Sequence, residues 1–499
     1  MAYLKDLLKQ VTYICTRGTM DCKVTHICHD SRQVVRGSMF ICLAGSREDG
    51  HDYLAQAIRK GAAVCVVSKH VWVEGDVTVI RVRNTSEAMA WIARNYYGAP
   101  AEAMQMIGIT GTKGKTTTAC MLYQMLKEAG VKCGLIGTLG VRRSDGLKKA
   151  GSNTTPDALV LQKELREMAD AGCSCCVMEV SSQGLKHYRV EGIIFAIGIY
   201  TNLSMDHIGP GEHRSFREYA CCKKRLFERS RMICINADDK YHGFMTANLE
   251  APVYTYGIEQ PCDVKAEHIV YERSSRGLNV TYQTTGWIKD EIVLKMPGTA
   301  NVYNSLAAME AAHLLGISPE TIRKTLRNVS VKGRIEEVRI SDKFDVVIDY
   351  AHNAASLESL IKTLRQYQPK RLVLLFGCGG NRSPLRRFQM GETAGRLSDV
   401  TILTSDNPRY EKPEAILSDI EQGMKRTKGK YKIIPDRREA ISYAISQAQE
   451  GDLIVVAGKG HEEYQEIEGH FYPMNEREMI ENSIGGESMA KYANIIIKN

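Results

Sequence analysis

The sequence contains no long apolar run. No stretch approaches the roughly 20 consecutive apolar residues that a membrane-spanning helix needs. The amino-terminal segment MAYLKDLLKQ lacks the continuous apolar core of a signal peptide. Two CxxC pairs at zinc-finger spacing are also absent, although the chain has 15 cysteines. We therefore expect a cytoplasmic protein without a membrane partner, whose thiols, including those of Cys173, Cys175 and Cys176, are buried and reduced.

The chain also lacks a large excess of charge of one sign. Lysine and arginine number 66 against 58 aspartates and glutamates, a formal net charge of +8 over 499 residues. A basic excess of this size suits anionic small molecules at least as well as a polyphosphate backbone, so we expect a nucleotide and no nucleic-acid partner. Internal repeats and low-complexity tracts are absent, and the length favours about three domains.

Strand-like and helix-like segments alternate along the chain, with two breaks. Gly98-Ala99-Pro100 interrupts a helical pattern, and a second break falls at Lys332-Gly333-Arg334. The strands MIGIT, CCVMEV, FDVVIDY, RLVLLFG and LIVVAGK are separated by helical segments, which is typical of parallel α/β sheets. We predict an α/β protein with a small α/β amino-terminal domain (1–100), a central P-loop parallel-sheet ATPase domain (101–333) and a doubly wound Rossmann-like carboxy-terminal domain (334–499).

The strand MIGIT runs directly into a glycine-rich turn and a helical segment that begins at Lys115. In this order the turn and the helix amino terminus can bind phosphate oxygens, Lys115 can hold the β and γ phosphates, and Thr116 can ligate Mg²⁺. The general pattern has glycine where this chain has Ile109, so a turn that merely connects strand to helix remains the alternative. The candidate ATP-binding residues of this loop are Gly111, Thr112, Lys113, Gly114, Lys115, Thr116 and Thr117.

Two further strands end at polar residues that can reach the same sheet edge. Glu179 ends the strand CCVMEV, and Asp206 and His207 follow the strand IIFAIGIYTNL. Taken singly, Glu179 could pair with a surface lysine and His207 could be an ordinary loop histidine. Together they favour a second Mg²⁺ site, because this ion prefers hard oxygen ligands and tolerates an imidazole.

Eight ordered motifs resemble the Mur ligase family in sequence and spacing. They are GTKGKTT, MEVSSQGL, TNLSMDH, VKGRIEE, DYAHN, FGCGGNR, DNPR and GKGHEEYQ, and the first domain adds Asp30-Ser31-Arg32 and DGHDY. The likeness covers essentially the whole chain. The family variant of the phosphate loop begins with Gly-Thr and needs no earlier glycine, so it accounts for Ile109.

The resemblance implies an ADP-forming amide ligase of peptidoglycan synthesis that uses ATP and Mg²⁺. Its expected substrates are UDP-N-acetylmuramoyl-L-alanyl-D-glutamate and a third amino acid of the stem peptide, either meso-2,6-diaminopimelate or L-lysine. The carboxylate would be activated as an acyl phosphate, since direct condensation at neutral pH would have to expel oxide. A monomer is expected.

The resemblance also implies roles for individual residues. The expected catalytic residues are Lys115, Glu179, His207 and Lys223, and the expected metal ligands are Thr116, Glu179, His207 and a carbamylated Lys223. ATP would also contact Asn301, Asn304, Arg334, Asp349 and His352. The residues matched to the UDP-linked substrate are Ser31, Asn153, Thr154, Thr155, Ser181, His187 and Arg189.

The choice of amino acid rests on the turn Asp406-Asn407-Pro408-Arg409, which follows the strand VTILTS. On composition alone, this could be an Asx turn stiffened by proline with its arginine in solvent. Within the family, the same motif accompanies meso-diaminopimelate, whose distal carboxylate a guanidinium can bind with two parallel hydrogen bonds. The residues expected to bind the amino acid are Arg382, Asp406, Asn407, Pro408, Arg409, Gly458 and Glu462.

Three alternatives remain. L-lysine could replace diaminopimelate, because Asn381 and Ser383 stand beside Arg382 where aspartates are common in the family. A folylpolyglutamate-type or cyanophycin-type ligase is disfavoured by the DSR motif and by Asn153-Thr154-Thr155-Pro156. A P-loop binding protein or motor rests on the loop and the positive charge alone. Cys378 is predicted to lie in a tight strand-to-helix turn rather than to act as a nucleophile.

Overall fold

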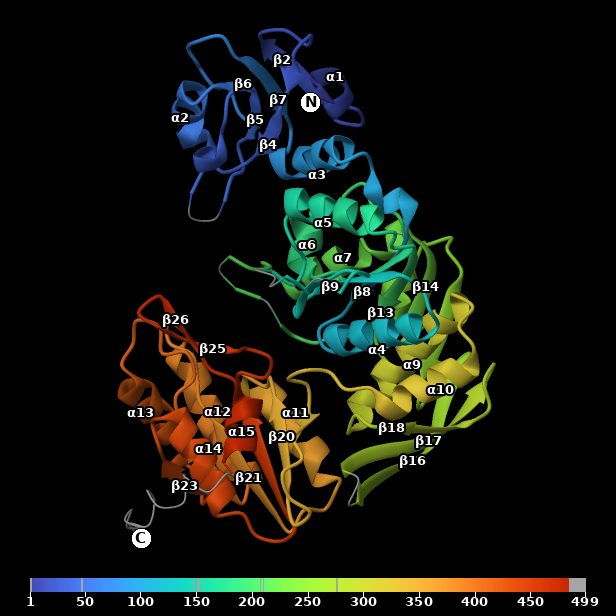
Figure 1. Ribbon diagram of the computed structural model, residues 1–499, viewed down its shortest axis with the longest axis vertical. Coiled ribbons are helices and arrows are strands. Elements are labelled where there is room, and N and C mark those ends of the chain that lie inside the picture. The colour runs from blue at the N-terminus through green and yellow to red at the C-terminus, as the bar shows by residue number, and fades with distance from the viewer. Residues whose placement is uncertain are drawn as a thin grey trace. The chain divides into compact units, whose positions relative to one another are not determined.

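The computed structural model describes residues 2–45, 48–146, 148–149, 153–206, 208–209, 211–274 and 277–483. The chain forms two compact units, whose elements are labelled in Figure 1. The first unit comprises Met1–Lys265, Gly286–Ile288 and Tyr303–Ile322, and the second comprises Ala266–Thr285, Lys289–Val302 and Arg323–Asn499. Both are α/β, as predicted, and the division of the chain into three domains remains a prediction from the sequence.

The amino-terminal part of the first unit is a five-stranded sheet in the order β2-β7-β6-β5-β4. Strands β4 to β7 are parallel and β2 is antiparallel to β7. One sheet face packs on α1 and α3 and the other on α2, because side chains alternate along each strand. The elements are β1 (Ala2–Tyr3), α1 (Leu4–Leu7), β2 (Tyr13–Arg17), β3 (Lys23–Val24), β4 (His26–Cys28), β5 (Ser38–Ile41), α2 (Leu54–Arg59), β6 (Ala62–Val67), β7 (Thr78–Val82) and α3 (Thr85–Tyr96).

The central part is built on six parallel strands in the order β9-β12-β8-β13-β14-β15. They are β8 (Gln105–Thr110), β9 (Cys133–Gly137), β12 (Cys175–Glu179), β13 (Phe195–Tyr200), β14 (Ser230–Asn236) and β15 (Val253–Gly257). Antiparallel β10 (Gly140–Arg142) and β11 (Lys148–Lys149) extend one edge. The helices are α4 (Lys115–Glu128), α5 (Ala158–Asp170), α6 (Ser182–Lys186), α7 (Phe216–Lys224) and α8 (His242–Thr246).

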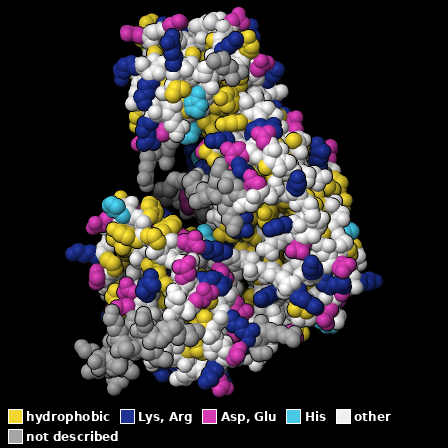
Figure 2. Space-filling view, viewed as in Figure 1, with side chains coloured by type: hydrophobic (Ala, Val, Ile, Leu, Met, Phe, Trp, Pro, Cys, Tyr) yellow, Lys and Arg dark blue, Asp and Glu magenta, His cyan; other side chains and the backbone are white. Residues whose placement is uncertain are grey.

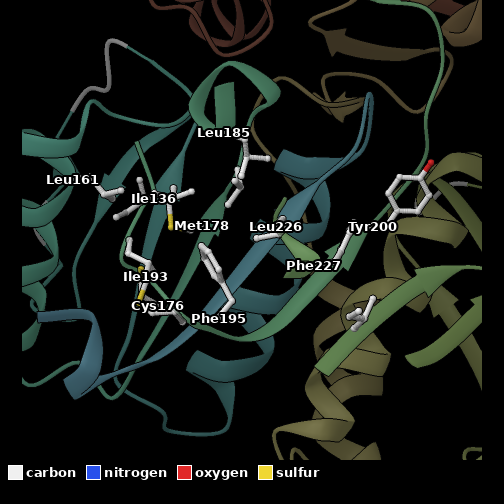
Figure 3. Packing of buried hydrophobic residues seen from close by; sticks show 14 of the residues in the cluster. Ile136, Leu161, Cys176, Met178, Leu185, Ile193, Phe195, Tyr200, Leu226 and Phe227 are labelled. Atoms are coloured by element: carbon white, nitrogen blue, oxygen red, sulfur yellow. The ribbon is translucent and has the colours of Figure 1, made fainter. Parts of the chain in front are cut away.

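A buried cluster holds the helices to this sheet. Figure 3 shows Ile136, Met178 and Phe195, which lie on three strands, packed with Leu185 of α6 and with Leu226, which follows α7. These side chains are at most 1% exposed. The tight packing fixes the carboxyl ends of β8, β12 and β13 at one edge, where ligands bind in open parallel sheets.

The chain then forms an extension of the central sheet that the sequence did not predict. Strand β16 (Val264–Ser274) pairs with β15 at its first two residues and continues into the second unit, where β17 (Gly277–Gly286) and β18 (Glu291–Leu294) follow. Helices α9 (Thr299–Leu314) and α10 (Pro319–Asn328) come next.

The second unit contains a six-stranded sheet in the order β19-β20-β24-β21-β22-β23, parallel except for β19. Its strands are β19 (Glu336–Glu337), β20 (Asp345–Asp349), β21 (Arg371–Phe376), β22 (Val400–Leu403), β23 (Lys430–Ile433) and β24 (Asp452–Ala457). The helices are α11 (Ala354–Arg365), α12 (Pro384–Leu397), α13 (Pro413–Met424), α14 (Arg437–Ser446) and α15 (Glu476–Asn482), and β25 (Tyr464–Ile467) and β26 (His470–Pro473) form a hairpin.

Helices cover both faces of that sheet, which confirms the doubly wound prediction. Helices α14 and α15 pack on the face that carries Ile348, Val373 and Ile454. Helix α12 packs between α11 and α13, and none of these three helices contributes to the cluster that α14 and α15 form with the sheet. Strand β24 inserts between β20 and β21, so the loops after these three strands open at one edge, where the strand order reverses.

Three features of the structure concern membrane spanning, the cysteines and the surface charge. Within the described ranges, no helix combines the length and the apolar character needed to cross a bilayer. All 15 cysteines lie in the described part of the chain and none forms a disulfide; Cys173, Cys175 and Cys176 are buried, as predicted. On the face seen in Figure 2, basic and acidic side chains are interspersed on the described surface rather than gathered in a single-sign stripe.

Candidate functional site

The glycine-rich turn between β8 and α4 forms a tight phosphate-type loop. Gly111 and Gly114 have φ angles of 151° and 87°, and Gly114 is the N-cap residue of α4. A Cβ atom on Gly111 would lie 1.9 Å from Oγ1 of Thr201, so only glycine fits there. The loop therefore presents backbone N–H groups and the amino terminus of a 14-residue helix, an arrangement suited to anionic phosphates.

The side chain of Lys115 lies over this loop. Its Nζ donates to the carbonyl oxygens of Gly111 at 2.9 Å and Thr112 at 3.1 Å. From the opposite side, Thr201 Oγ1 donates to the carbonyl of Lys113 at 2.6 Å, and Asn304 accepts from Thr118 Oγ1 at 3.3 Å. The loop is thus held from β13 and α9 while its lysine stays beside the backbone that would surround a phosphate.

Glu179, at the end of β12, is brought directly to the loop. Its carboxylate accepts from Thr116 Oγ1 at 2.9 Å and from the backbone N–H of Thr138 at 2.8 Å, and the glutamate is 2% exposed. Thr138 was not predicted, because no pattern in the sequence connects it with the loop. The paired oxygens of Thr116 and Glu179 are the donor type that Mg²⁺ prefers.

Lys223 of α7 is buried against the same loop. It is 1% exposed, its Nζ donates to the Gly111 carbonyl at 2.7 Å, and it lies 4.6 Å from the centre of the Tyr219 ring. Burial, with a smaller contribution from Lys115, holds the pKa of Lys223 well below its ordinary value. The lowered pKa favours the uncharged amine, which is the form that reacts as a nucleophile.

The structure brings some of the expected metal ligands together, and the metal site itself remains a prediction. Thr116, Glu179 and Lys223 all surround the loop, whereas His207 lies outside the described residues. Among the residues that the structure describes, no group of three or more His, Cys, Asp or Glu side chains is placed to bind a metal. An oxygen donor at Lys223 would therefore have to come from its modification.

Residues matched to the UDP-linked substrate gather behind Glu179. Thr155 Oγ1 donates to the Glu179 carbonyl at 2.9 Å and accepts from the Ser181 N–H at 2.9 Å, while Arg189 donates to the Thr155 carbonyl at 2.8 Å. Thr154 lies 3.1 Å from Thr138, oxygen to oxygen. These contacts place Thr154, Thr155, Ser181 and Arg189 in one network with the glutamate beside the phosphate loop.

His187 lines a separate cavity of about 300 Å³ with Arg83, Asn84, Lys186 and Tyr188. Burial and the neighbouring Arg189 lower its pKa, so the imidazole is neutral at pH 7. Ser31 is not part of this cavity; its Oγ donates to Gln56 Oε1 at 2.9 Å. Asn153 is exposed, directly after residues 150–152, which the structure does not describe.

Three of the expected ATP residues of the second unit, Arg334, Asp349 and His352, lie at or near the end of β20, and Asn301 lies in α9. Asp349 accepts from the N–H groups of Ile335 and Ala351, both at 2.8 Å, and the Arg334 guanidinium lies 4.8 Å from the Tyr350 ring centre. His352 follows two residues later and its carbonyl accepts from Arg386 at 3.0 Å. Asn301 donates to the Pro297 carbonyl at 2.8 Å.

Six of the seven residues expected to bind the amino acid line one cavity of about 130 Å³ at the carboxyl ends of β20, β21, β22 and β24, and Pro408 is not part of its lining. Its lining contains Arg382, Asp406, Asn407, Arg409, Gly458 and Glu462, together with Tyr350, His352, Cys378, Gly379, Arg386 and Arg387. Guanidinium groups and carboxylates thus share a single cavity. Such a lining suits a ligand that carries both anionic and cationic groups.

Arg409 is held within this cavity rather than left in solvent. Its Nε donates to Glu466 at 2.9 Å and its Nη1 to the Gly380 carbonyl at 2.8 Å, and its side chain is 25% exposed. Backbone bonds link Arg409 to Glu466 and Glu468 of the segment around β25. The turn's Pro408 carbonyl closes against Gly380, where a Cβ would approach to 1.8 Å. The alternative of an arginine that points into solvent is therefore wrong for Arg409.

Cys378 also lies in this lining, as part of the turn after β21. It is 7% exposed and its thiol contacts Met390 Sδ at 3.5 Å. Burial raises its pKa to about 12, so a thiolate nucleophile is disfavoured.

Comparison with known proteins agrees with the loop and the two α/β units. Three models match: "Mur ligase family, catalytic domain" over residues 23–97, "Mur ligase middle domain" over 109–312 and "Mur ligase, glutamate ligase domain" over 333–460. The architecture and the phosphate loop are those of an ATP-dependent ligase, and the chain belongs to the Mur ligase family.

Curated relatives are similar over nearly the full length. A UDP-N-acetylmuramoyl-L-alanyl-D-glutamate--2,6-diaminopimelate ligase from Caldanaerobacter subterraneus subsp. tengcongensis is 41% identical over 478 residues, covering 96% of this chain and 98% of that protein. A ligase of the same name from Clostridium perfringens is 38% identical over 495 residues, covering 97% and 100%. A solved structure of a ligase with this name has a TM-score of 0.67 at 30% identity, covering 92% of this chain and 94% of that one.

Proposed function

We propose that this chain joins 2,6-diaminopimelate to UDP-N-acetylmuramoyl-L-alanyl-D-glutamate at the expense of ATP. The observation that carries the proposal is the cavity in which Arg409 and Arg382 stand with Asp406 and Glu462. Diaminopimelate differs from lysine by a distal carboxylate, which a guanidinium binds through parallel charge-assisted bonds. Relatives that share about two fifths of their residues with this chain bear the name of that activity.

The reaction proceeds in two steps. A terminal carboxylate oxygen of D-glutamate forms a bond to the γ phosphorus of ATP as the bond to ADP breaks, giving an acyl phosphate. The amine of the incoming amino acid then bonds to the acyl carbon and loses a proton, and inorganic phosphate leaves. Lys115 and the loop N–H groups stabilise the charge on the transferring phosphoryl group by position rather than by covalent chemistry.

Thr116 and Glu179 fit a Mg²⁺ ion, since their paired oxygens lie 2.9 Å apart beside the loop. When bound, the ion would neutralise phosphate charge there. Lys223 is suited to carbamylation: its uncharged amine adds to CO₂, forming an N–C bond and releasing a proton, and the product carries a carboxylate. That carboxylate supplies the oxygen donor that the lysine itself lacks.

The experiment that tests the proposal is a ligation assay on the purified wild-type chain. UDP-N-acetylmuramoyl-L-alanyl-D-glutamate, ATP and either meso-diaminopimelate or L-lysine are incubated together, and phosphate release and the UDP-linked product are measured. We expect product with diaminopimelate, and preference for it when both amino acids compete. A preference for lysine would overturn the amino-acid assignment, and no product with either would overturn the ligase assignment. Product formation with folate and glutamate instead would support the folylpolyglutamate alternative.

A further inference from the structure

Lys459 is a buried lysine immediately beneath the amino-acid cavity. It follows β24 between Gly458 and Gly460, which have φ angles of 113° and 55°, and its side chain is 0% exposed. A buried ammonium must be compensated by hydrogen bonds and opposite charge. Its Nζ donates to Asn407 Oδ1 at 2.9 Å and to Glu462 Oε2 at 3.2 Å, and Asp406 Oδ1 lies 3.9 Å away.

These contacts fix which way the Asn407 amide points. Its oxygen accepts from Lys459 Nζ and also from the backbone N–H of Glu466 at 3.0 Å. Its nitrogen donates to Glu462 Oε2 at 2.8 Å. Because an amide has one acceptor end and one donor end, two donors on one side and a carboxylate on the other leave a single satisfactory orientation.

The same contacts orient Glu462. One oxygen, Oε2, accepts from both Asn407 and Lys459. The other, Oε1, is 3.4 Å from the Tyr350 hydroxyl, which also lines the cavity. Lys459 therefore anchors one carboxylate oxygen and leaves the other to face a ligand.

Lys459 also sets the charge of this end of the cavity. Asp406 and Glu462 carry two negative charges, and Lys459 lies within 4 Å of a carboxylate oxygen of each. With the lysine present, part of this negative charge is compensated from below the cavity. Without it, the two carboxylates would lose the cation that lies within 4 Å of an oxygen of each.

We propose that Lys459 is a positioning residue for the amino-acid substrate, acting through Asn407 and Glu462. The inference rests on the proposed function, because it assigns a role within the same cavity. Lys459 does not itself line that cavity, so it touches the ligand only through these two side chains. Its loss is expected to weaken binding of the amino acid selectively and to leave the nucleotide and UDP-linked substrates unaffected.

The test is a set of variants assayed with all three substrates. For Lys459→Met we expect the KM for the amino acid to rise about tenfold or more, since a buried carboxylate and amide lose their partner. The KM values for ATP and the UDP-linked substrate should stay near those of wild type, and Lys459→Arg should recover part of the loss. Lys432→Met is the matched control: Lys432 lies over the Tyr443 ring at 4.0 Å, away from the cavity lining, and its replacement should change none of the three KM values.

Two results would overturn the role of Lys459: an amino-acid KM within about twofold of wild type, or an equal rise in all three KM values. If Lys459→Met does not fold, as thermal unfolding will show, Lys459→Gln takes its place with the same criteria. A wild-type chain that ligates neither meso-diaminopimelate nor L-lysine refutes the proposed function. A wild-type chain that ligates either of them, with an unaffected Lys459 variant, refutes only this inference.

Discussion

Replacing Arg409 by alanine tests the amino-acid assignment most directly. The substitution removes a guanidinium that donates to Glu466 at 2.9 Å and to the Gly380 carbonyl at 2.8 Å and lines the cavity. It leaves the phosphate loop intact, because that loop belongs to the first unit. The expected effect is a loss of affinity for diaminopimelate with little change in the KM for ATP.

The size of the expected loss of affinity follows from the partial burial of the Arg409 side chain. Truncating one partner of a buried hydrogen-bonded charge pair costs about 2–5 kcal/mol. The Arg409 side chain is 25% exposed, and Glu466 already compensates part of its charge, so the lower end applies. About 2 kcal/mol corresponds to roughly a 30-fold rise in the KM for diaminopimelate. The Glu466 carboxylate that remains repels the distal carboxylate of the substrate and acts in the same direction.

The assay is steady-state phosphate release with diaminopimelate, ATP and the UDP-linked substrate varied in turn. Arg409→Lys is the matched control; it keeps the charge but loses the planar fork, so it should recover only part of the affinity. Lysine as substrate lacks the distal carboxylate, so its KM should change far less in Arg409→Ala. A diaminopimelate KM within about threefold of wild type in the alanine variant would refute the assigned contact.

Three further outcomes are expected. Lys115→Ala should abolish ATP turnover while the thermal unfolding temperature stays near that of wild type, because a loop lysine contributes far more to phosphate charge than to folding; near-normal turnover would contradict the loop assignment. Lys223→Ala should lose activity and regain a portion with added short carboxylic acids, and mass spectrometry without acidification should detect the carbamate; a variant that keeps full activity would remove its role. Burial raises the pKa of Glu310 from 4.5 to about 7. Between pH 4.5 and pH 7, Glu310 is therefore protonated in the folded chain and ionised in the unfolded chain. The free energy of unfolding should therefore fall by about 3 kcal/mol as pH rises from about 4.5 to about 7, and Glu310→Gln should flatten this slope in denaturant titrations; an unchanged slope would show that another group titrates.

Local patterns in the sequence predicted the elements that carry their own signals. The strand and helix around the phosphate loop, and the alternation from β20 to β24, are strongly apolar and were identified correctly. Strands β16 and β17 were missed; beyond Ala266, β16 alternates only between half-buried and exposed residues, so it has no run of buried apolar residues to mark it. Helix α3 begins at Thr85, because the Asn84 side chain caps the N–H groups of Ser86 and Glu87.

In the candidate sites, too, some features follow from local sequence patterns and others depend on the fold. Gly111 to Thr117 form one continuous segment, so the spacing of its residues predicted the geometry of the loop. Thr138 reaches Glu179 only through the fold, which leaves no local pattern to detect. Lys459 lies in the motif GKGHEEYQ beside Glu462, but its contact with Asn407 also depends on the fold. The motif Asp406 to Arg409 predicted which residues line the cavity, but their orientation depends on β25, more than 50 residues later.

Arg409 shows why that orientation requires the fold. Its φ of 54° lies in the left-handed region, which residues other than glycine adopt at a cost. The cost is offset by backbone bonds in which Arg409 donates to the Glu466 carbonyl at 3.0 Å and accepts from Glu468 at 2.7 Å. A turn with the same four residues but without β25 would relax to ordinary backbone angles and aim its arginine elsewhere. The specificity of this cavity is therefore a property of the turn and the β25 segment together, and the motif alone is an incomplete sign of the amino acid that a ligase accepts.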